Sequence, residues 1–228
     1  MNQVGRVPGG RTRSATRVIS STTGALVGFF GIEHGFFEML QGDIAPSGFI
    51  IDAIGPEQKF WPGASEPAFT IIPSFLVTGI CAMLVGFLVM IWACGFVHRK
   101  YGARILMSLC ILLFLVGGGS PPLFSGTIAC IIATRIGKPL MWWRTHLSDD
   151  TRNNLARLWP WSLIIYVVIS LFAVEIAVLG YPLIWLLSTD IVYIIVWVIG
   201  PISDVPLVVS IIAALAYDIQ EQTMVADM

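Results

Sequence analysis

The sequence has few charged residues for its length. Of its 228 residues, 12% are Asp, Glu, Lys or Arg and 56% are hydrophobic. Soluble globular domains carry about 25% charged and about 45–50% apolar residues. So little polar surface cannot cover a water-soluble particle, which excludes a cytosolic enzyme, a secreted disulfide-rich domain and a disordered tail. We therefore expect the chain to lie in a lipid bilayer.

The sequence also lacks the simplest signals for nucleic acid, zinc and redox chemistry. The formal net charge of −1 gives no bulk attraction to nucleic acid, so no nucleic-acid partner is expected. The H-E-x-x-H pattern of zinc proteases is absent. The cysteines lie in apolar runs without zinc-ribbon or C-x-x-C spacing: Cys81, Cys94, Cys110 and Cys130. No cofactor is predicted, although a bound cation or metal ion is compatible with the acidic residues described below.

The apolar runs predict an all-α fold, a polytopic bundle of about six transmembrane helices within one membrane domain, residues 18–217. About 20 apolar residues are needed for each span. The predicted spans are about 18–41, 72–97, 104–119, 121–135, 161–187 and 191–217. A basic tail, 1–17, precedes them, and a tail, 218–228, follows. The segment 144–159 is expected to lie on the membrane surface as an amphipathic helix capped by Ser148 or Asp149.

The third and fourth predicted spans are short and are separated by the sequence Gly-Gly-Gly-Ser-Pro-Pro, residues 117–122. They form either two minimal spans or a re-entrant hairpin, which is tolerated only where protein or water covers its backbone. We favour two short spans, which brings both termini to the same side.

The basic residues predict the orientation. If the N-terminus is cytoplasmic, 12 of the 13 Lys and Arg residues fall on the cytoplasmic side, and Lys59 is the exception. Basic residues concentrate on that side of membrane proteins. The sequence thus predicts a multi-pass protein of the cell (inner or cytoplasmic) membrane with both termini inside.

Ionisable residues within the predicted spans are the main indication of function, because each costs about 2.5–3.5 kcal/mol at the bilayer centre on insertion scales. Counting along the spans places Glu175 and Asp204 near the midplane on antiparallel neighbouring helices. Pro201 and Pro206 remove backbone donors, so the last span is expected to kink or open there and to present carbonyl oxygens next to Ser203. These residues are candidates for a proton or cation site, together with three residues of the first span: Glu33, His34 and Glu38.

A stripe of glycines follows one face of the first span: Gly24, Gly28, Gly31 and Gly35. Small residues at this spacing let helices approach closely, so the stripe is a candidate contact for a second copy or for a partner membrane subunit. If the stripe faces inward, His34 and Glu38 reach the bundle interior, while Glu33 points almost to the opposite side. The i, i+4 spacing of His34 and Glu38 is compatible with metal binding, with Glu175 and Asp204 completing the shell.

Residues 31–42, Gly-Ile-Glu-His-Gly-Phe-Phe-Glu-Met-Leu-Gln-Gly, and residues 117–123, Gly-Gly-Gly-Ser-Pro-Pro-Leu, resemble a family of small polytopic membrane proteins of prokaryotes that has no assigned activity. The resemblance runs from the first span to about Trp143. It implies an integral membrane protein and supplies no catalytic residues.

Three function classes remain. The first is a proton- or cation-linked transporter or channel component that uses the midplane carboxylates. The second is a non-catalytic accessory subunit of a membrane complex, and the third is an intramembrane metal-dependent enzyme. We favour transport, because two midplane carboxylates and two prolines in one helix cost more stability than a scaffold requires.

Overall fold

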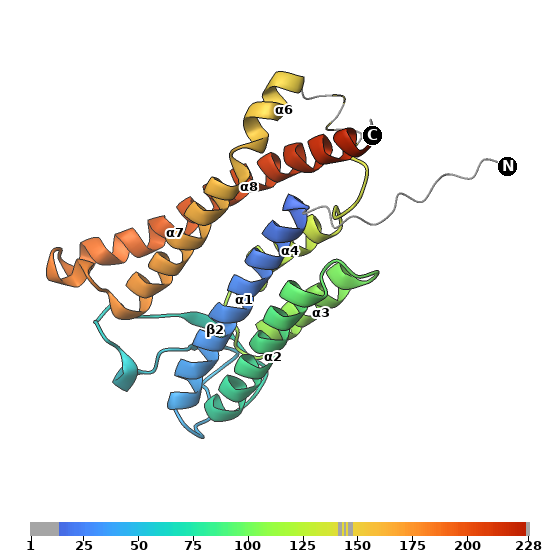
Figure 1. The fold of residues 1–228 in the computed structure, drawn as a ribbon. Helices are drawn as coiled ribbons and strands as arrows, with labels where there is room; N and C mark the ends of the chain where they lie inside the picture. Colours follow the sequence, from blue (N-terminus) through green and yellow to red (C-terminus); the bar gives the residue numbers. More distant parts are fainter. Residues whose placement is uncertain (1–13, 141–142, 144, 146–147, 227–228) are drawn as a thin grey trace.

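The computed structural model describes residues 14–140, 143, 145 and 148–226, and its described part is mostly helical (Figure 1). The α-helices are α1 (Ala15–Leu40), α2 (Phe75–Gly95), α3 (Gly102–Leu115), α4 (Ser125–Ala133), α6 (Asp149–Ala156), α7 (Trp159–Leu179) and α8 (Thr189–Ala226). Two strands, β1 (Ile50–Asp52) and β2 (Pro67–Phe69), pair antiparallel, and two 3-10 turns are η1 (Pro56–Gln58) and η2 (Leu183–Trp185). The predicted all-α fold is confirmed for the described residues, apart from this small hairpin.

Three helices in the described chain are long and apolar enough to cross a membrane: α2, α7 and α8. α1 has 26 residues but is not among them, since it carries polar and charged residues along its length. α3 and α4 have 14 and 9 residues, or about 21 Å and 14 Å at 1.5 Å per residue, against a hydrocarbon core of about 30 Å. The chain therefore has the features of a membrane protein, but the prediction of six spans is not supported.

α1 lies at the centre of the helices around it, and 15 of its 26 residues are buried. Its glycine stripe brings it into backbone contact with α2. A Cβ atom at Gly28 would lie 2.5 Å from the carbonyl oxygen of Gly86, and one at Gly35 would lie 2.6 Å from that of Gly79. Cβ atoms at Gly24 and Gly31 would meet side chains instead, Ala93 of α2 at 2.7 Å and Leu113 of α3 at 2.6 Å. The stripe thus packs helices within the chain, and these positions are not free to contact another subunit.

The N-terminal end of α1 is capped by a residue of α8. The carboxylate of Asp218 accepts hydrogen bonds from the backbone N–H groups of Ala15 (2.7 Å) and Thr16 (3.2 Å) and from the Ser14 hydroxyl (2.7 Å). The described helices extend into both predicted tails, since α1 begins at Ala15 and α8 continues to Ala226. Residues 1–13 and 227–228 lie outside the described residues.

The last two long helices also differ from their predicted spans. α7 ends at Leu179, because Gly180 follows with a left-handed φ of 69°, whereas the span was expected to reach residue 187. α8 remains helical through Pro201 and Pro206, and the Ser203 hydroxyl donates to the Gly200 carbonyl at 2.6 Å. The expected opening of this helix is therefore wrong.

The predicted surface helix is present over part of its length. α6 begins after Ser148, whose hydroxyl oxygen accepts a hydrogen bond from the Thr151 N–H, so Ser148 is the cap among the two predicted candidates, Ser148 and Asp149. Residues 144, 146 and 147 of the predicted segment lie outside the described residues.

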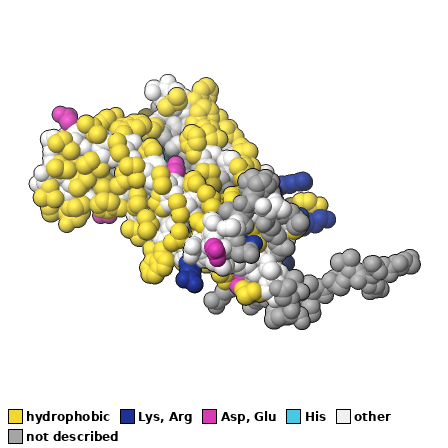
Figure 2. Space-filling model, turned by 90° about the horizontal axis from the view of Figure 1, so that it is seen from above, with side chains coloured by type: hydrophobic (Ala, Val, Ile, Leu, Met, Phe, Trp, Pro, Cys, Tyr) yellow, Lys and Arg dark blue, Asp and Glu magenta, His cyan; other side chains and the backbone are white. Residues whose placement is uncertain are grey.

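Hydrophobic side chains predominate on the described part of the face shown in Figure 2. Only 33%, 33% and 17% of the apolar windows of α2, α7 and α8 are buried within the chain. The outer faces of these helices are therefore suited to contact lipid or another membrane protein.

Candidate functional site

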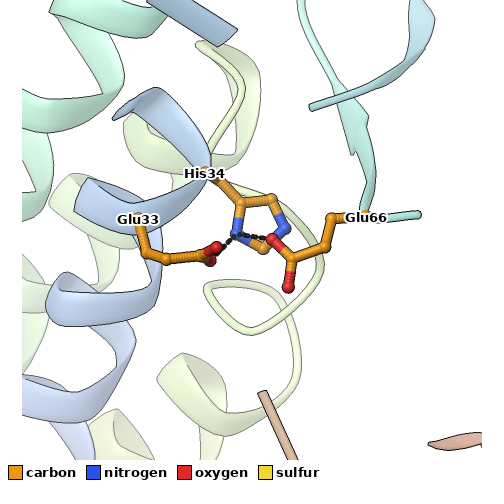
Figure 3. Close-up of side chains that lie close together, drawn as sticks. All are labelled: Glu33, His34 and Glu66. Atoms are coloured by element: carbon orange, nitrogen blue, oxygen red, sulfur yellow. Dashed lines mark ion pairs between the residues drawn. The ribbon is translucent and has the colours of Figure 1, made fainter. Parts of the chain in front are cut away.

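Three segments that are distant in the sequence meet around His34. The Nδ1 atom of this buried residue lies 3.2 Å from Oε2 of Glu33, its neighbour on α1, and 3.2 Å from Oε2 of Glu66, the residue before β2. The carbonyl oxygen of Phe30, one turn earlier on α1, is 3.0 Å from the same nitrogen. Figure 3 shows the two carboxylates reaching this ring nitrogen from the helix and from the loop.

Glu66 is held over the end of α1 by the β-hairpin. Its backbone N–H donates to Oδ1 of Asp52 at 2.8 Å, and its carbonyl oxygen accepts from the N–H of Ala53 at 2.9 Å. The side-chain amide of Gln41, the last residue of the α1 C-terminal turn, donates to the carbonyl oxygens of Asp52 (3.0 Å) and Ala53 (2.8 Å). The hairpin, and Glu66 with it, is therefore attached directly to α1.

The glycine turn between α3 and α4 forms the third wall of the site. Gly117 and Gly119 are buried and have left-handed φ values of 103° and 70°. A Cβ atom at Gly117 would lie 2.5 Å from Oε1 of Glu38, and one at Gly119 would lie 2.6 Å from Cδ2 of His34. Glycine is required here both by the backbone conformation and by the close approach to the site.

The site has an excess of buried acid. Glu38 is fully buried, and no described residue hydrogen-bonds either of its carboxylate oxygens. Outside the cluster of Glu33, His34 and Glu66 itself, no described residue donates a hydrogen bond to Oε2 of Glu66 or to the oxygens of Glu33. Among the described residues, no Lys or Arg forms an ion pair with these three glutamates, and His34 is the only basic partner of Glu33 and Glu66. Burial raises the pKa of Glu66 well above its usual range, although the nearby His34 opposes the shift. Such a cluster favours the binding of positive charge.

The glycine stripe of α1 faces inward, and His34 and Glu38 are both buried, as expected for that orientation of the helix. Glu33 begins on another side of the helix, as expected, but its flexible side chain turns toward His34. Glu66 was not singled out from the sequence. An acidic residue before a short apolar segment is a common pattern, and only the folding of the hairpin over α1 brings it to His34.

Glu175 and Asp204 do not join this site. Both side chains are exposed, and the one group of three potential metal ligands found among the described residues is Glu33, His34 and Glu66. Glu175 lies four residues before the end of α7 and Asp204 lies fifteen residues into α8, about 6 Å and 22 Å from the intervening turn. The two carboxylates therefore lie at different distances from the turn between their helices, and the expected shell of His34, Glu38, Glu175 and Asp204 is not formed. The Ser203 hydroxyl is used within α8.

Comparison with known proteins identifies no relative of this chain. No protein-family model matches the sequence, and no curated protein and no solved structure matches the chain. The resemblance to a family of small prokaryotic membrane proteins stays a prediction, and the function has to be argued from the site itself.

Proposed function

We propose that this chain moves cations across a membrane, as a transporter or as a component of a channel, with Glu33, His34, Glu38 and Glu66 as its cation site. The observation that supports this most is the buried excess of carboxylates around a single histidine. Removing an ionised carboxylate from water costs several kcal/mol unless positive charge or hydrogen bonds compensate it. A site that binds a passing cation gives these residues that compensation.

The short α3–α4 hairpin supports a pathway to the site. Irregular backbone at membrane depth is tolerated where it is buried in protein or lines a cavity, and transporters use such interrupted helices at their ion sites. The buried Gly117 and Gly119 form this kind of segment directly against Glu38 and His34. The lengths of α3 and α4 favour the re-entrant alternative over two complete spans.

The proposed topology has α1, α2, α7 and α8 crossing the membrane, with α3 and α4 entering and leaving on the side of the basic residues. α1 is less apolar than the other three but is covered by them and by α4. At one end of the molecule, burial and then the charges of Arg17 and Arg99 lower the pKa of His98, which supports a common side for the start of α1 and the turn after α2. That side is cytoplasmic by the distribution of positive charge, so both termini lie there.

Flux in liposomes tests the proposed function. The purified chain is reconstituted in vesicles that contain a pH-sensitive dye or a divalent-metal-sensitive dye, and a cation gradient is applied. We expect wild-type flux for at least one dye, loss of most of it in Glu33→Gln/Glu66→Gln, and retention in the matched pair Glu175→Gln/Asp204→Asn, whose residues are exposed. Equal signals from wild type, both double variants and empty vesicles would refute cation movement. Loss of flux only in Glu175→Gln/Asp204→Asn would indicate that the cation site lies on α7 and α8 instead.

Asp204 favours a second function, that of an accessory subunit. Its side chain is exposed on α8 among large exposed apolar residues, including Ile202, Val205 and Val208. A carboxylate facing lipid at this depth is costly, so a partner helix with a hydrogen-bond donor or a basic residue is favoured against this face. Affinity purification from mild detergent tests the idea: a membrane protein that co-purifies with wild type and is lost with Asp204→Leu supports it, and wild type purifying alone contradicts it.

A further inference from the structure

Three potential ligand atoms around His34 have the spacing of a metal site (Figure 3). Nδ1 of His34 is 3.2 Å from Oε2 of Glu33 and 3.2 Å from Oε2 of Glu66. Ligand atoms of all three residues lie within 4.8 Å of one another. An ion with four ligands at about 2.0–2.1 Å holds neighbouring donor atoms about 3.3 Å apart. Both nitrogen–oxygen separations are close to this value.

The donor types select the class of ion. Ca²⁺ and Mg²⁺ are bound almost entirely by oxygen atoms, whereas imidazole nitrogen suits Zn²⁺ and the divalent ions of iron, nickel and copper. One imidazole with two carboxylates is therefore a donor set for a divalent transition-metal ion or Zn²⁺.

A second observation points to a ligand independently of the spacing. The Glu66 side chain is 7% exposed, and apart from the contacts that Glu33, His34 and Glu66 make with one another, no described residue donates a hydrogen bond to Oε2 of Glu66 or to the oxygens of Glu33. Glu38, one turn beyond His34, is fully buried, and neither of its carboxylate oxygens has a hydrogen-bond partner among the described residues. Buried carboxylate oxygens in proteins are normally hydrogen-bonded, paired or bound to a metal.

We propose that Glu33, His34 and Glu66 bind one divalent ion of the Zn²⁺ class, with Glu38 as the neighbouring negative charge. This assigns a class of cation to the proposed cation site, and the biological role of the ion rests on the proposed function. On binding, the ion replaces the proton through which Nδ1 donates to the Phe30 carbonyl oxygen, 3.0 Å away, and this proton passes to water. Asp52, which accepts the Glu66 N–H, and the glycine turn at Gly119 hold two of the ligands in place.

Metal titration of the purified full-length chain in detergent tests the proposal. After chelator treatment, Zn²⁺ binding is measured by calorimetry, and Co²⁺ is added as a spectroscopic probe, since its visible absorption is intense in four-coordinate sites. We expect one ion per chain in wild type. Glu66→Gln and Glu33→Gln keep the side-chain shape but remove a charged oxygen, and we expect at least about tenfold weaker binding in each. Glu57→Gln, an exposed acid in the same loop, is the matched control and should bind as wild type does.

Each outcome decides the proposal. Saturable binding that weakens in both ligand variants and not in Glu57→Gln supports the site. Lack of saturable Zn²⁺ binding in wild type, or equal affinity in wild type and both ligand variants, overturns it. Should Glu66→Gln fail to fold, the result with Glu33→Gln, whose side chain is less buried, decides. Metal binding without flux in liposomes would overturn the proposed function and support the metal site. Flux without metal binding would overturn the metal site and support the proposed function.

Discussion

His34 on α1 and Glu66 in the loop before β2 are joined by a contact of 3.2 Å between Nδ1 and Oε2. The contact links α1, of whose 26 residues 15 are buried, to the loop that precedes β2. The position of Glu66 relative to His34 therefore depends on the hydrogen bonds that hold the hairpin to α1. Substitution of residues that do not bind the ion themselves should consequently change the metal affinity of the site.

Asp52 should act as a positioning residue for Glu66. Its Oδ1 atom accepts hydrogen bonds from the N–H groups of Glu66 (2.8 Å) and Ile54 (3.2 Å), so Asp52→Ala frees this part of the hairpin. We expect about 10–100-fold weaker Zn²⁺ binding, the usual effect of losing a residue that orients a metal ligand. Calorimetric titration measures the change.

The conservative variant separates positioning from general stability. Asp52→Asn keeps an acceptor oxygen for both N–H groups but loses the ion pair with Lys59, 3.4 Å from Oδ2. We expect near wild-type metal affinity in Asp52→Asn and in Lys59→Gln. Wild-type affinity in Asp52→Ala would show that the hairpin does not position Glu66.

The turn at Gly119 should control the orientation of the His34 ring. In Gly119→Ala the new methyl group would lie 2.6 Å from Cδ2 of the ring, so the imidazole must leave the position in which Nδ1 contacts Glu33 and Glu66. Gly137→Ala is a close control: Gly137 has a similar φ of 66°, but no atom lies within 4 Å of the position that a Cβ atom would take there. Both variants carry the left-handed strain of about 1–2 kcal/mol.

We expect only Gly119→Ala to lose metal binding and the NMR chemical shifts of the native His34 ring. Thermal unfolding of both variants provides the comparison of stability. Equal metal affinity in the two variants would mean that the glycine turn does not contact the ring in solution.

The sequence predicted the features that depend on local composition. α2 and α7 begin within about three residues of their predicted starts, because unbroken apolar runs determine them. Helical phase placed the four glycines on one face, and the burial of His34 and Glu38 followed once that face packed inward. The error for Glu175 also has a local cause: Gly180 ends α7 earlier than hydropathy suggests, which brings this residue close to a helix end.

The remaining part of the site depends on contacts between distant segments. Nothing near Glu66 in the sequence indicates that it reaches His34, since the hairpin and the Gln41 side chain create that contact. The sequence Gly-Gly-Gly-Ser-Pro-Pro was correctly interpreted as a break between two short apolar segments. Its position against Glu38 and His34 follows from α3 packing alongside α1, which periodicity does not report.

The contact between α1 and α2 should be sensitive to a single methyl group. In Gly86→Ala the Cβ atom would lie 2.6 Å from the Gly28 carbonyl oxygen and 3.0 Å from Cγ1 of Ile32, and a backbone atom cannot move away without separating the helices. We expect a loss of about 1–3 kcal/mol in the free energy of unfolding. Gly95→Ala, in the same helix with no atom within 4 Å, should not destabilise the protein. Reversible unfolding in mixed micelles measures both, and similar stabilities would contradict the close helix approach.

Asp218 should connect the two ends of the described chain. Its carboxylate accepts the otherwise free N–H groups of Ala15 and Thr16 at the start of α1, where it also complements the positive end of the helix dipole. Asp218→Ala should lower the free energy of unfolding by about 1–2 kcal/mol, the usual cost of losing a helix cap. Amide hydrogen exchange should accelerate in the first turn of α1 and in the last part of α8, because α8 packs against α1 through this residue. Glu57→Ala, which removes an exposed acid, should change neither quantity. Protection that is lost in α1 but retained in α8 would mean that Asp218 caps the helix without holding the C-terminal part of α8 in place.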